Sequence, residues 1–389
     1  MTPRFLAAMV GAGLLAAQAP TLDSARTLLE KGSRGQAIRA LEQIVQANPR
    51  DAEARLLLGT VLAEDGKRSE AFAQLLEAVR LRPDSAAAHN ALGEASNSFG
   101  EKQAARGEFE KAVQLDPEFA PAQVNLGRVL VEAGELEASA LHLDRALRIL
   151  GNTPDAAYPH YLRAKVYTEQ NDPEKAAAEL KAAVALRPDF AEAWSDLGQA
   201  RKSLNDDAGA LAAFQRAVRL NPEGSVAQYR LGAEYLGQGK AHLAVAHLRI
   251  ADRLKPDSQA TLYALQNALR ADGQASEADR VKERLARLLR RIDTVSQNQF
   301  TALRLNNEGA ELEKQGDLRG ALEKYRAALE LDPDHVGIRV NYAVALLRLG
   351  QWTPGLAELR EAVRRDPNNP VLKAALDDAL SQAPPGAKD

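Results

Sequence analysis

The 389-residue chain contains no cysteine, which excludes disulfide bridges, thiolate zinc sites, cysteine nucleophiles and cysteine lipidation. Aromatic residues make up only 5% of the sequence, which suggests helices that pack through alanine and leucine. Neither sign of charge dominates, since 50 Lys and Arg are balanced by 53 Asp and Glu, and this disfavours a dedicated nucleic-acid-binding protein. The apolar fraction of 45% and the charged fraction of 26% are ordinary, and they disfavour a disordered chain or a protein with several membrane spans.

Long apolar runs are also lacking, apart from one at the N-terminus. It extends from Phe5 to Ala17, about 13 residues, whereas a membrane-spanning helix needs roughly 20. Arg4 before this run and the small residues after it are typical of a secretory signal peptide over residues 1–19, with a cut after Ala16 or Ala17.

We therefore expect a periplasmic or secreted protein that has no integral membrane span once the leader is removed. Two alternatives stay open at this point. An uncleaved leader could tether the protein to the membrane, or residues 1–19 could form an apolar helix that covers the open end of the domain.

Prolines recur along the chain with a fixed spacing. Within three groups every step is 34 residues, and steps of 37 and 77 separate the groups. A three-residue insertion explains the first irregular step, and one further repeat with nine extra residues explains the second. The prolines are Pro49, Pro83, Pro117, Pro154, Pro188, Pro222, Pro256, Pro333 and Pro367.

Each period has the pattern of two helices joined by a turn. Two apolar stripes at helical spacing are separated by a residue such as Gly134, Asn205 or Gly239, which permits a tight turn. The proline ends the second helix, because the residue before proline avoids the α region. In residues 191–224 the landmarks are Trp194, Leu197, Gly198, Ala210, Phe214, Ala217 and Leu220.

One such helix pair is too small to fold alone, because chains below about 40 residues rarely form a sufficient core. Stacking of successive pairs buries their shared apolar faces. The repeat therefore predicts a solenoid in which each unit is stabilised by its nearest neighbours.

The repeat closely resembles the tetratricopeptide repeat. Arg201 departs from the family's Tyr at its position, which Tyr167 and Tyr235 retain in neighbouring copies. The resemblance implies an all-α fold, a right-handed superhelical solenoid of antiparallel helix pairs. The residues that carry it are Trp194, Leu197, Gly198, Ala210, Phe214 and Pro222.

Ten units account for nearly the whole chain after the leader. Arg163 and Glu308 stand where most copies have Leu, and we interpret them as partly exposed variants, one of which could face a partner. The eighth unit is degenerate, and the insertion after it either lengthens a helix or forms a joint. The expected segments are residues 20–292 for repeats one to eight, 293–301 for the insertion, 302–369 for repeats nine and ten, and 370–389 for a capping helix and tail.

Basic residues crowd the second helix of the degenerate unit, and four of them form one helical stripe. Such a stripe could bind an anionic partner or a lipid surface. A solvated flank beside a buried one is commoner, and it is the interpretation that we favour. The stripe consists of Arg280, Arg284, Arg287 and Arg291.

Signatures of catalysis are absent from the sequence. His242 and His247 are five residues apart, so they do not share a helix face as metal-binding pairs at i and i+4 do. His89 and His160 take the position of Trp194 in their units, which favours a packing role. We therefore expect no enzymatic activity, no cofactor and no metal site.

Members of the family bind extended peptides or helices along a concave surface lined by the first helix of each unit, and the resemblance implies such a surface here. Repeat symmetry places Tyr161, Tyr229 and Tyr263 in one row of that surface, and Tyr158 lies on the same helix face as Tyr161. Tyrosine suits partner recognition because it combines apolar area with a hydroxyl. Packing of each Tyr on the neighbouring unit is the alternative.

The next row contains three asparagines, Asn125, Asn307 and Asn341. A side-chain amide can pair with both the N–H and the C=O of a peptide. Because Asn307 and Asn341 belong to consecutive units, the sequence predicts at most a short asparagine ladder. Three basic residues on nearby inner rows would add positive charge: Arg128, Lys165 and Lys202.

The sequence thus favours a non-catalytic scaffold of the cell envelope that binds peptides or helical segments of other proteins. Two alternatives stay open. The chain could be a substrate-recruiting accessory arm for a separately encoded enzyme, or an envelope module that binds glycans or lipids through the tyrosine row and the arginine stripe.

Overall fold

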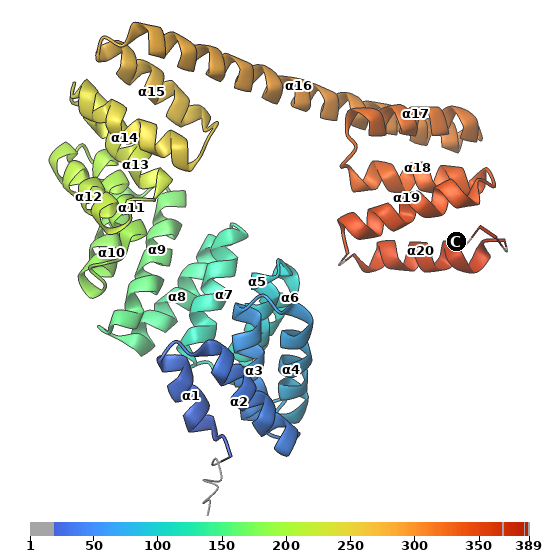
Figure 1. Cartoon of the computed structure of the whole chain (residues 1–389), viewed down its shortest axis with the longest axis horizontal. Coiled ribbons are helices and arrows are strands. Elements are labelled where there is room, and N and C mark those ends of the chain that lie inside the picture. Colours follow the sequence, from blue (N-terminus) through green and yellow to red (C-terminus); the bar gives the residue numbers. More distant parts are fainter. Residues whose placement is uncertain (1–18, 368, 385, 388–389) are drawn as a thin grey trace, which may run out of the picture. The chain divides into compact units, whose positions relative to one another are not determined.

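The computed structural model describes residues 19–367, 369–384 and 386–387, so the predicted signal peptide, apart from its last residue, lies outside the described residues. The described chain forms twenty α-helices and one short 3-10 helix, η1 (Pro154–Ala156), and contains no strand (Figure 1). The α-helices are α1 (Leu22–Glu30), α2 (Arg34–Ala47), α3 (Ala52–Glu64), α4 (Arg68–Leu81), α5 (Ala86–Ser98), α6 (Lys102–Leu115), α7 (Ala120–Glu132), α8 (Leu136–Leu150), α9 (Ala157–Glu169), α10 (Pro173–Leu186), α11 (Ala191–Ser203), α12 (Asp207–Leu220), α13 (Ser225–Gly237), α14 (Ala241–Leu254), α15 (Gln259–Ala271), α16 (Ala275–Lys314), α17 (Leu318–Leu331), α18 (Val336–Arg348), α19 (Trp352–Arg365) and α20 (Pro370–Gln382).

Consecutive helices pair within each repeat. In the first compact unit, which ends at Ala210, α3 packs on α4, α5 on α6, α7 on α8 and α9 on α10. In the second unit, which begins at Leu211, α13 packs on α14, α15 on α16, and α18 on α19. The predicted all-α fold of stacked antiparallel helix pairs is confirmed in both units, whereas the right-handed superhelical path of the whole chain stays a prediction.

Left-handed backbone conformations mark the turn inside each pair. Gly134 and Gly239, with φ of 77° and 72°, occupy this place, and Asn205 occupies it with a φ of 61°. Glycine adopts such angles without a steric penalty, and asparagine tolerates them better than most residues. The predicted turn residues therefore end the first helix of their repeats as expected.

The two helices of a repeat approach most closely where a glycine faces a large side chain. A Cβ atom on Gly93 of α5 would lie 2.6 Å from Cε1 of Phe109 of α6, and one on Gly309 would lie 2.7 Å from Cε1 of Tyr325. Phe109 and Tyr325 are almost completely buried. Because interiors are close-packed, only glycine leaves room for this contact, which sets the spacing of the helix pair.

The same large side chain also contacts the first helix of the following repeat. Phe109 packs with Leu126 and Val129 of α7, and Leu75 packs with Leu92 and Ala95 of α5. We call the place of Phe109 the stacking position, and the places of Leu126 and Val129 the receiving positions. At the stacking position nine repeats have an apolar or aromatic side chain that is at most 2% exposed: Leu41, Leu75, Phe109, Leu143, Leu180, Phe214, Leu248, Tyr325 and Leu359.

Helix α16 departs from the repeat pattern, because its 40 residues continue through residues 293–301. Its first half packs on α15, where Leu285 and Leu288 contact Leu262, and its second half packs on α17 (Figure 1). From the sequence, two alternatives are expected for residues 293–301, a lengthened helix or a joint. The structure contains the lengthened helix. Despite this length, no helix within the described ranges is apolar enough over a sufficient span to cross a bilayer.

Helix α20 covers the last repeat. Its residues Leu376, Ala379 and Leu380 pack against Leu356 and Leu359 of α19. The outer face of α20 is polar in most places, so this helix separates the apolar face of repeat ten from solvent.

Two glycine-to-alanine substitutions in the third repeat test the close approach of its helices. Gly93→Ala places a methyl group against Phe109 and should lower the free energy of unfolding by about 1–3 kcal/mol. Gly107→Ala, on the exposed side of α6 with no atom within 4 Å of the new methyl, should raise it by about 0.5–1 kcal/mol. Thermal and urea unfolding followed by circular dichroism measure both changes, and equal effects of the two substitutions would contradict the proposed helix contact.

Candidate protein-binding surfaces

The first helices of successive repeats contact one another and form rows, one in the first unit and two in the second. In the first unit α3 contacts α5, α5 contacts α7, and α7 contacts α9 (Figure 1). In the second unit α13 contacts α15, and α16 contacts α18. The candidate binding residues from the sequence lie on these first helices.

Tyr161 and Tyr158, in the first unit, pack against other aromatic rings. The Tyr161 ring centroid lies 4.9 Å from that of Phe190, which precedes α11, and 6.2 Å from that of Tyr158. Burial, and then the nearby carboxylate of Asp196, raises the pKa of the Tyr161 hydroxyl. Burial likewise raises the pKa of Tyr158. Tyr161 therefore contributes to the contact between repeats five and six as well as to the surface.

Tyr229 and Tyr263, which belong to the second unit, differ from Tyr158 and Tyr161 in how much of the ring is exposed. Tyr229 of α13 is half-buried, and Tyr263 of α15 is 61% exposed. Of the four predicted tyrosines, Tyr263 thus presents the largest free fraction of its ring.

Two of the three predicted asparagines form hydrogen bonds between consecutive repeats. Asn125 Nδ2 donates to Oδ1 of Asn90 at 3.0 Å, and Asn341 Nδ2 donates to Oδ1 of Asn306 at 2.8 Å. Asn90 and Asn306 each lie one residue before the predicted row, and the short ladder of Asn307 and Asn341 stays a prediction. Asn125 also donates to Glu94 at 2.9 Å.

The three predicted basic residues are each engaged within the first unit. Arg128 forms an ion pair with Glu132 at 3.2 Å, and Lys202 forms one with Asp207 at 2.6 Å. The ammonium group of Lys165 lies 5.0 Å from the ring centroid of Tyr161. A partner would therefore meet partly neutralised charges at this surface.

Part of the arginine stripe is paired with the preceding repeat in the second unit. Arg284 contacts Asp252 at 2.7 Å and Asp257 at 3.0 Å, and Arg291 contacts Asp257 at 3.4 Å. The pKa of Asp257 is lowered, first by its hydrogen bond from Arg284. Two of the four stripe residues thus have a structural role in joining repeats seven and eight.

A groove of about 760 Å³ lies on repeat nine, between α16 and α17. Sequence reasoning did not find this groove as such. Its apolar lining comes from Phe300, Leu303 and Leu312, and Asn307 is at its wall. It lies on the side of repeat nine where a preceding repeat packs in the other copies.

A polar clamp that sequence reasoning missed recurs across the repeats. In six repeats the side chain six residues after the repeat proline donates to the carbonyl oxygen of that proline. In five of these six it also contacts a side chain 19 residues further on. In repeat four, Gln123 donates to Pro117 at 2.8 Å and lies 2.7 Å from His142. The clamp residues that bond to the proline are Arg55, His89, Gln123, Trp194, Gln228 and Arg339.

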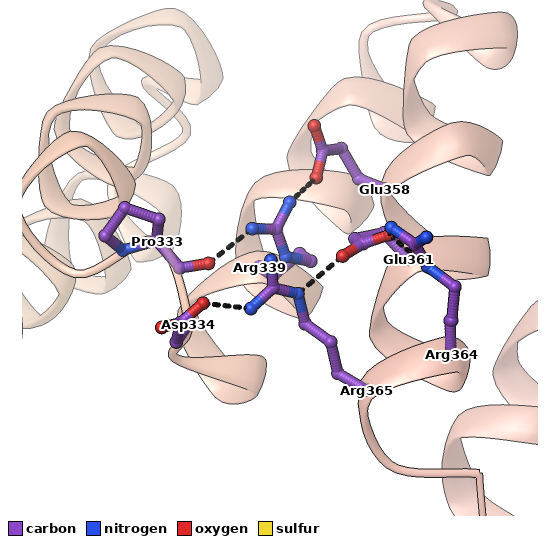
Figure 2. A network of polar contacts seen from close by, with 7 residues as sticks. All are labelled: Pro333, Asp334, Arg339, Glu358, Glu361, Arg364 and Arg365. Carbon is purple, nitrogen blue, oxygen red and sulfur yellow. Dashed lines mark hydrogen bonds and ion pairs between the residues drawn. The ribbon is translucent and has the colours of Figure 1, made fainter.

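Repeat ten has the most extended form of the clamp (Figure 2). Arg339 donates to the carbonyl of Pro333 at 2.5 Å and pairs with Glu358 of α19. Next to it, Arg365 bridges Glu361 and Asp334. The signal that could have revealed the clamp is the shared spacing of residues with N–H groups at the ends of their side chains, although the residue types differ.

The clamp accounts for four of the six histidines as structural groups. His89 contacts Glu108 and His160 contacts Glu179, each at 2.6 Å. His142 and His247 each contact a glutamine, and burial lowers the pKa of both imidazoles. Among the described residues no group of three or more His, Asp or Glu could hold a metal ion.

Comparison with known families agrees with this architecture. Two family models described as tetratricopeptide repeat match the sequence, and together their matches cover more than half of it. The chain belongs to the tetratricopeptide repeat family. One model matches residues 22–86, 62–118 and 161–225, and the other matches residues 99–166 and 312–379.

Solved tetratricopeptide repeat structures resemble parts of the chain. PilF of Pseudomonas aeruginosa is 19% identical with a TM-score of 0.51, and the match covers 56% of this chain and 98% of PilF. A tetratricopeptide repeat protein from Parabacteroides merdae is 14% identical with a TM-score of 0.49, over 64% of this chain and 96% of that one. YrrB, described as having an unusual peptide-binding site, is 23% identical with a TM-score of 0.40, over 49% and 96%. The likeness to PilF shows the fold alone, and no curated protein matches the sequence.

Proposed function

We propose that this tetratricopeptide repeat protein is a non-catalytic scaffold that binds peptides or helical segments of other proteins along its first helices. The observation that carries the proposal is the row of contacting first helices, α3, α5, α7 and α9 in the first unit and α13 and α15 in the second, in a family that generally mediates protein–protein interaction. Tyr229 and Tyr263 offer half-buried and exposed aromatic surface on that row, as recognition sites commonly do.

We also propose that the scaffold works in the cell envelope. The composition of residues 1–19, with Arg4 followed by a short apolar run and small residues, supports export. Mass spectrometry of the N-terminus of the protein purified from its own cells tests this proposal. A mature chain that begins directly after Ala16 or Ala17 is expected, and a chain that retains the whole segment in a cytoplasmic fraction would contradict it.

Site-specific photocrosslinking tests the proposed binding surface. With a photoreactive phenylalanine analogue in place of Tyr229 on α13, ultraviolet irradiation in the native cell should link the scaffold to a discrete partner protein. The same analogue in place of Leu243, which is exposed on the paired helix α14, should not yield this product, because the second helix faces away from the row. Capture of the same partner with equal yield from both positions would contradict the assignment of the surface.

A further inference from the structure

The junction between repeats eight and nine lacks the apolar contact that joins other repeats. At the stacking position repeat eight has Lys282, which is exposed, where the other nine repeats have a buried apolar or aromatic side chain. At the receiving positions repeat nine has Glu308 and Glu311. An apolar contact is thus replaced on both sides at once, by a cation on one face and two anions on the other. Such a reciprocal replacement is typical of two faces that meet.

A charged receiving position is accommodated elsewhere in this chain by an ion pair across the repeat boundary. Arg163 of α9 occupies the first receiving position of repeat five. Its guanidinium lies 2.8 Å from the carboxylate of Asp144, the residue after the stacking residue Leu143 of repeat four. A charged receiving position is thus joined to the preceding repeat by an ion pair, beside the apolar contact of Leu143 with Leu162 and Val166.

Lys282 and Glu308 cannot meet within one chain, because both belong to α16. They are 26 residues apart, which is about 39 Å along the helix at 1.5 Å per residue. The two repeat faces are accordingly uncovered. Tyr263 of repeat eight is 61% exposed, whereas its equivalent Leu56 packs against the following repeat. The corresponding face of repeat nine is the groove of about 760 Å³.

An exposed apolar stripe on α16 connects these two faces. Of the thirteen large apolar side chains that are exposed among the described residues, five lie between positions 289 and 303. Residues 7, 11 or 18 positions apart lie on the same side of an α-helix, because these spacings are close to whole numbers of turns. Leu289 and Phe300 follow Lys282 by 7 and 18 residues, and Glu311 follows Phe300 by 11, so all of them lie on the side of Lys282. The five are Leu289, Ile292, Val295, Phe300 and Leu303.

We propose that a second copy of the chain covers this surface. The two α16 helices run antiparallel, and repeat nine of each copy stacks on repeat eight of the other. The arrangement is an exchange of repeats nine and ten about a two-fold axis, so every contact occurs twice. It goes beyond the proposed scaffold function and does not depend on it.

Two independent observations select the same register for this pair. In an antiparallel pair of identical helices, the sequence numbers of any two residues that lie opposite each other have the same average. This average is the midpoint of the pair. The pairing of Lys282 with Glu308 and Glu311, which the stacking rule of the other repeats dictates, has its midpoint close to residue 296. The apolar stripe has the same centre, since residue 296 is the midpoint of Leu289 with Leu303 and of Ile292 with Phe300.

The charge distribution of α16 also favours an antiparallel second copy. Residues 275–292 contain six basic and three acidic side chains, whereas residues 293–314 contain two basic and four acidic ones. Antiparallel pairing therefore sets the basic half of one helix against the acidic half of the other. Within one chain Glu308 contacts Lys324 at 2.7 Å and also Arg304, and Glu311 contacts Lys314 at 2.7 Å, so Lys282 of the second copy joins existing pairs.

Cysteine crosslinking tests the exchange directly, because the native chain has no cysteine. The full-length variants Lys282→Cys and Glu308→Cys are mixed, allowed to exchange and oxidised. With equal amounts of the two variants, about half of the dimers are expected to be mixed and to become disulfide-linked, while either variant alone stays unlinked, because its two cysteines are about 39 Å apart along the paired helices. No gain of linked dimer in the mixture would overturn the proposal. A chain with both cysteines that closes on itself as a monomer would also overturn it, since repeat nine would then stack within its own chain.

Charge reversal provides a second test with a built-in rescue. Light scattering should give the unmodified protein twice the chain mass, and Lys282→Glu or Glu311→Lys alone should shift it toward the single-chain mass by placing like charges opposite each other. Mixing the two variants restores opposite charges at both contacts of a mixed dimer and should restore the double mass. A single-chain mass for the unmodified protein at every concentration, or failure of the mixture to recover, would contradict the exchanged dimer.

Discussion

In nine of the ten repeats one buried side chain lies at the stacking position, and the rest of the solenoid depends on the contacts that this side chain makes. Phe109 fills the space above Gly93 of its own first helix, and it also packs with Leu126 and Val129 of the next repeat. The spacing within a hairpin and the contact between hairpins are therefore set by the same group. A hairpin that cannot bury enough surface alone gains its core through this shared residue. In repeat eight, Gln266 takes the place of Gly93 and Lys282 takes the place of Phe109. After this repeat the regular stacking stops, and the long helix α16 continues into repeat nine.

The two helices of a repeat have different roles, and this leaves the first helices available for partners. The stacking side chains come from the second helices, and in six repeats a polar clamp anchors the first helix to the preceding proline carbonyl, as Gln123 does at Pro117. Recognition residues on the first helices can then vary without loss of the stack. Tyr161 shows the limit of this freedom, because its ring contacts Phe190 and so serves both packing and surface.

Much of this architecture could be predicted from the sequence because its signals are local and repeated. Prolines and turn residues such as Gly134 fix the ends of the helices, and the apolar stripes fix their faces. The partners of single side chains are fixed less exactly, and the sequence did not reveal that Asn341 bonds to Asn306 of the preceding repeat. The continuity of α16 had one available signal, the absence of Gly and Pro between Gly273 and Gly309. The clamp escaped prediction because arginine, histidine, glutamine and tryptophan share only a terminal N–H donor.

Hydrogen exchange of a Phe109→Ala variant tests most directly whether one side chain stabilises two repeats at once. The amides of α5, α6 and α7 should exchange faster together, because the cavity removes contacts within repeat three and with repeat four. The amides of α1 and α2, two repeats away, should keep their rates. Faster exchange confined to α6, or spread evenly over all helices of the first unit, would contradict the account.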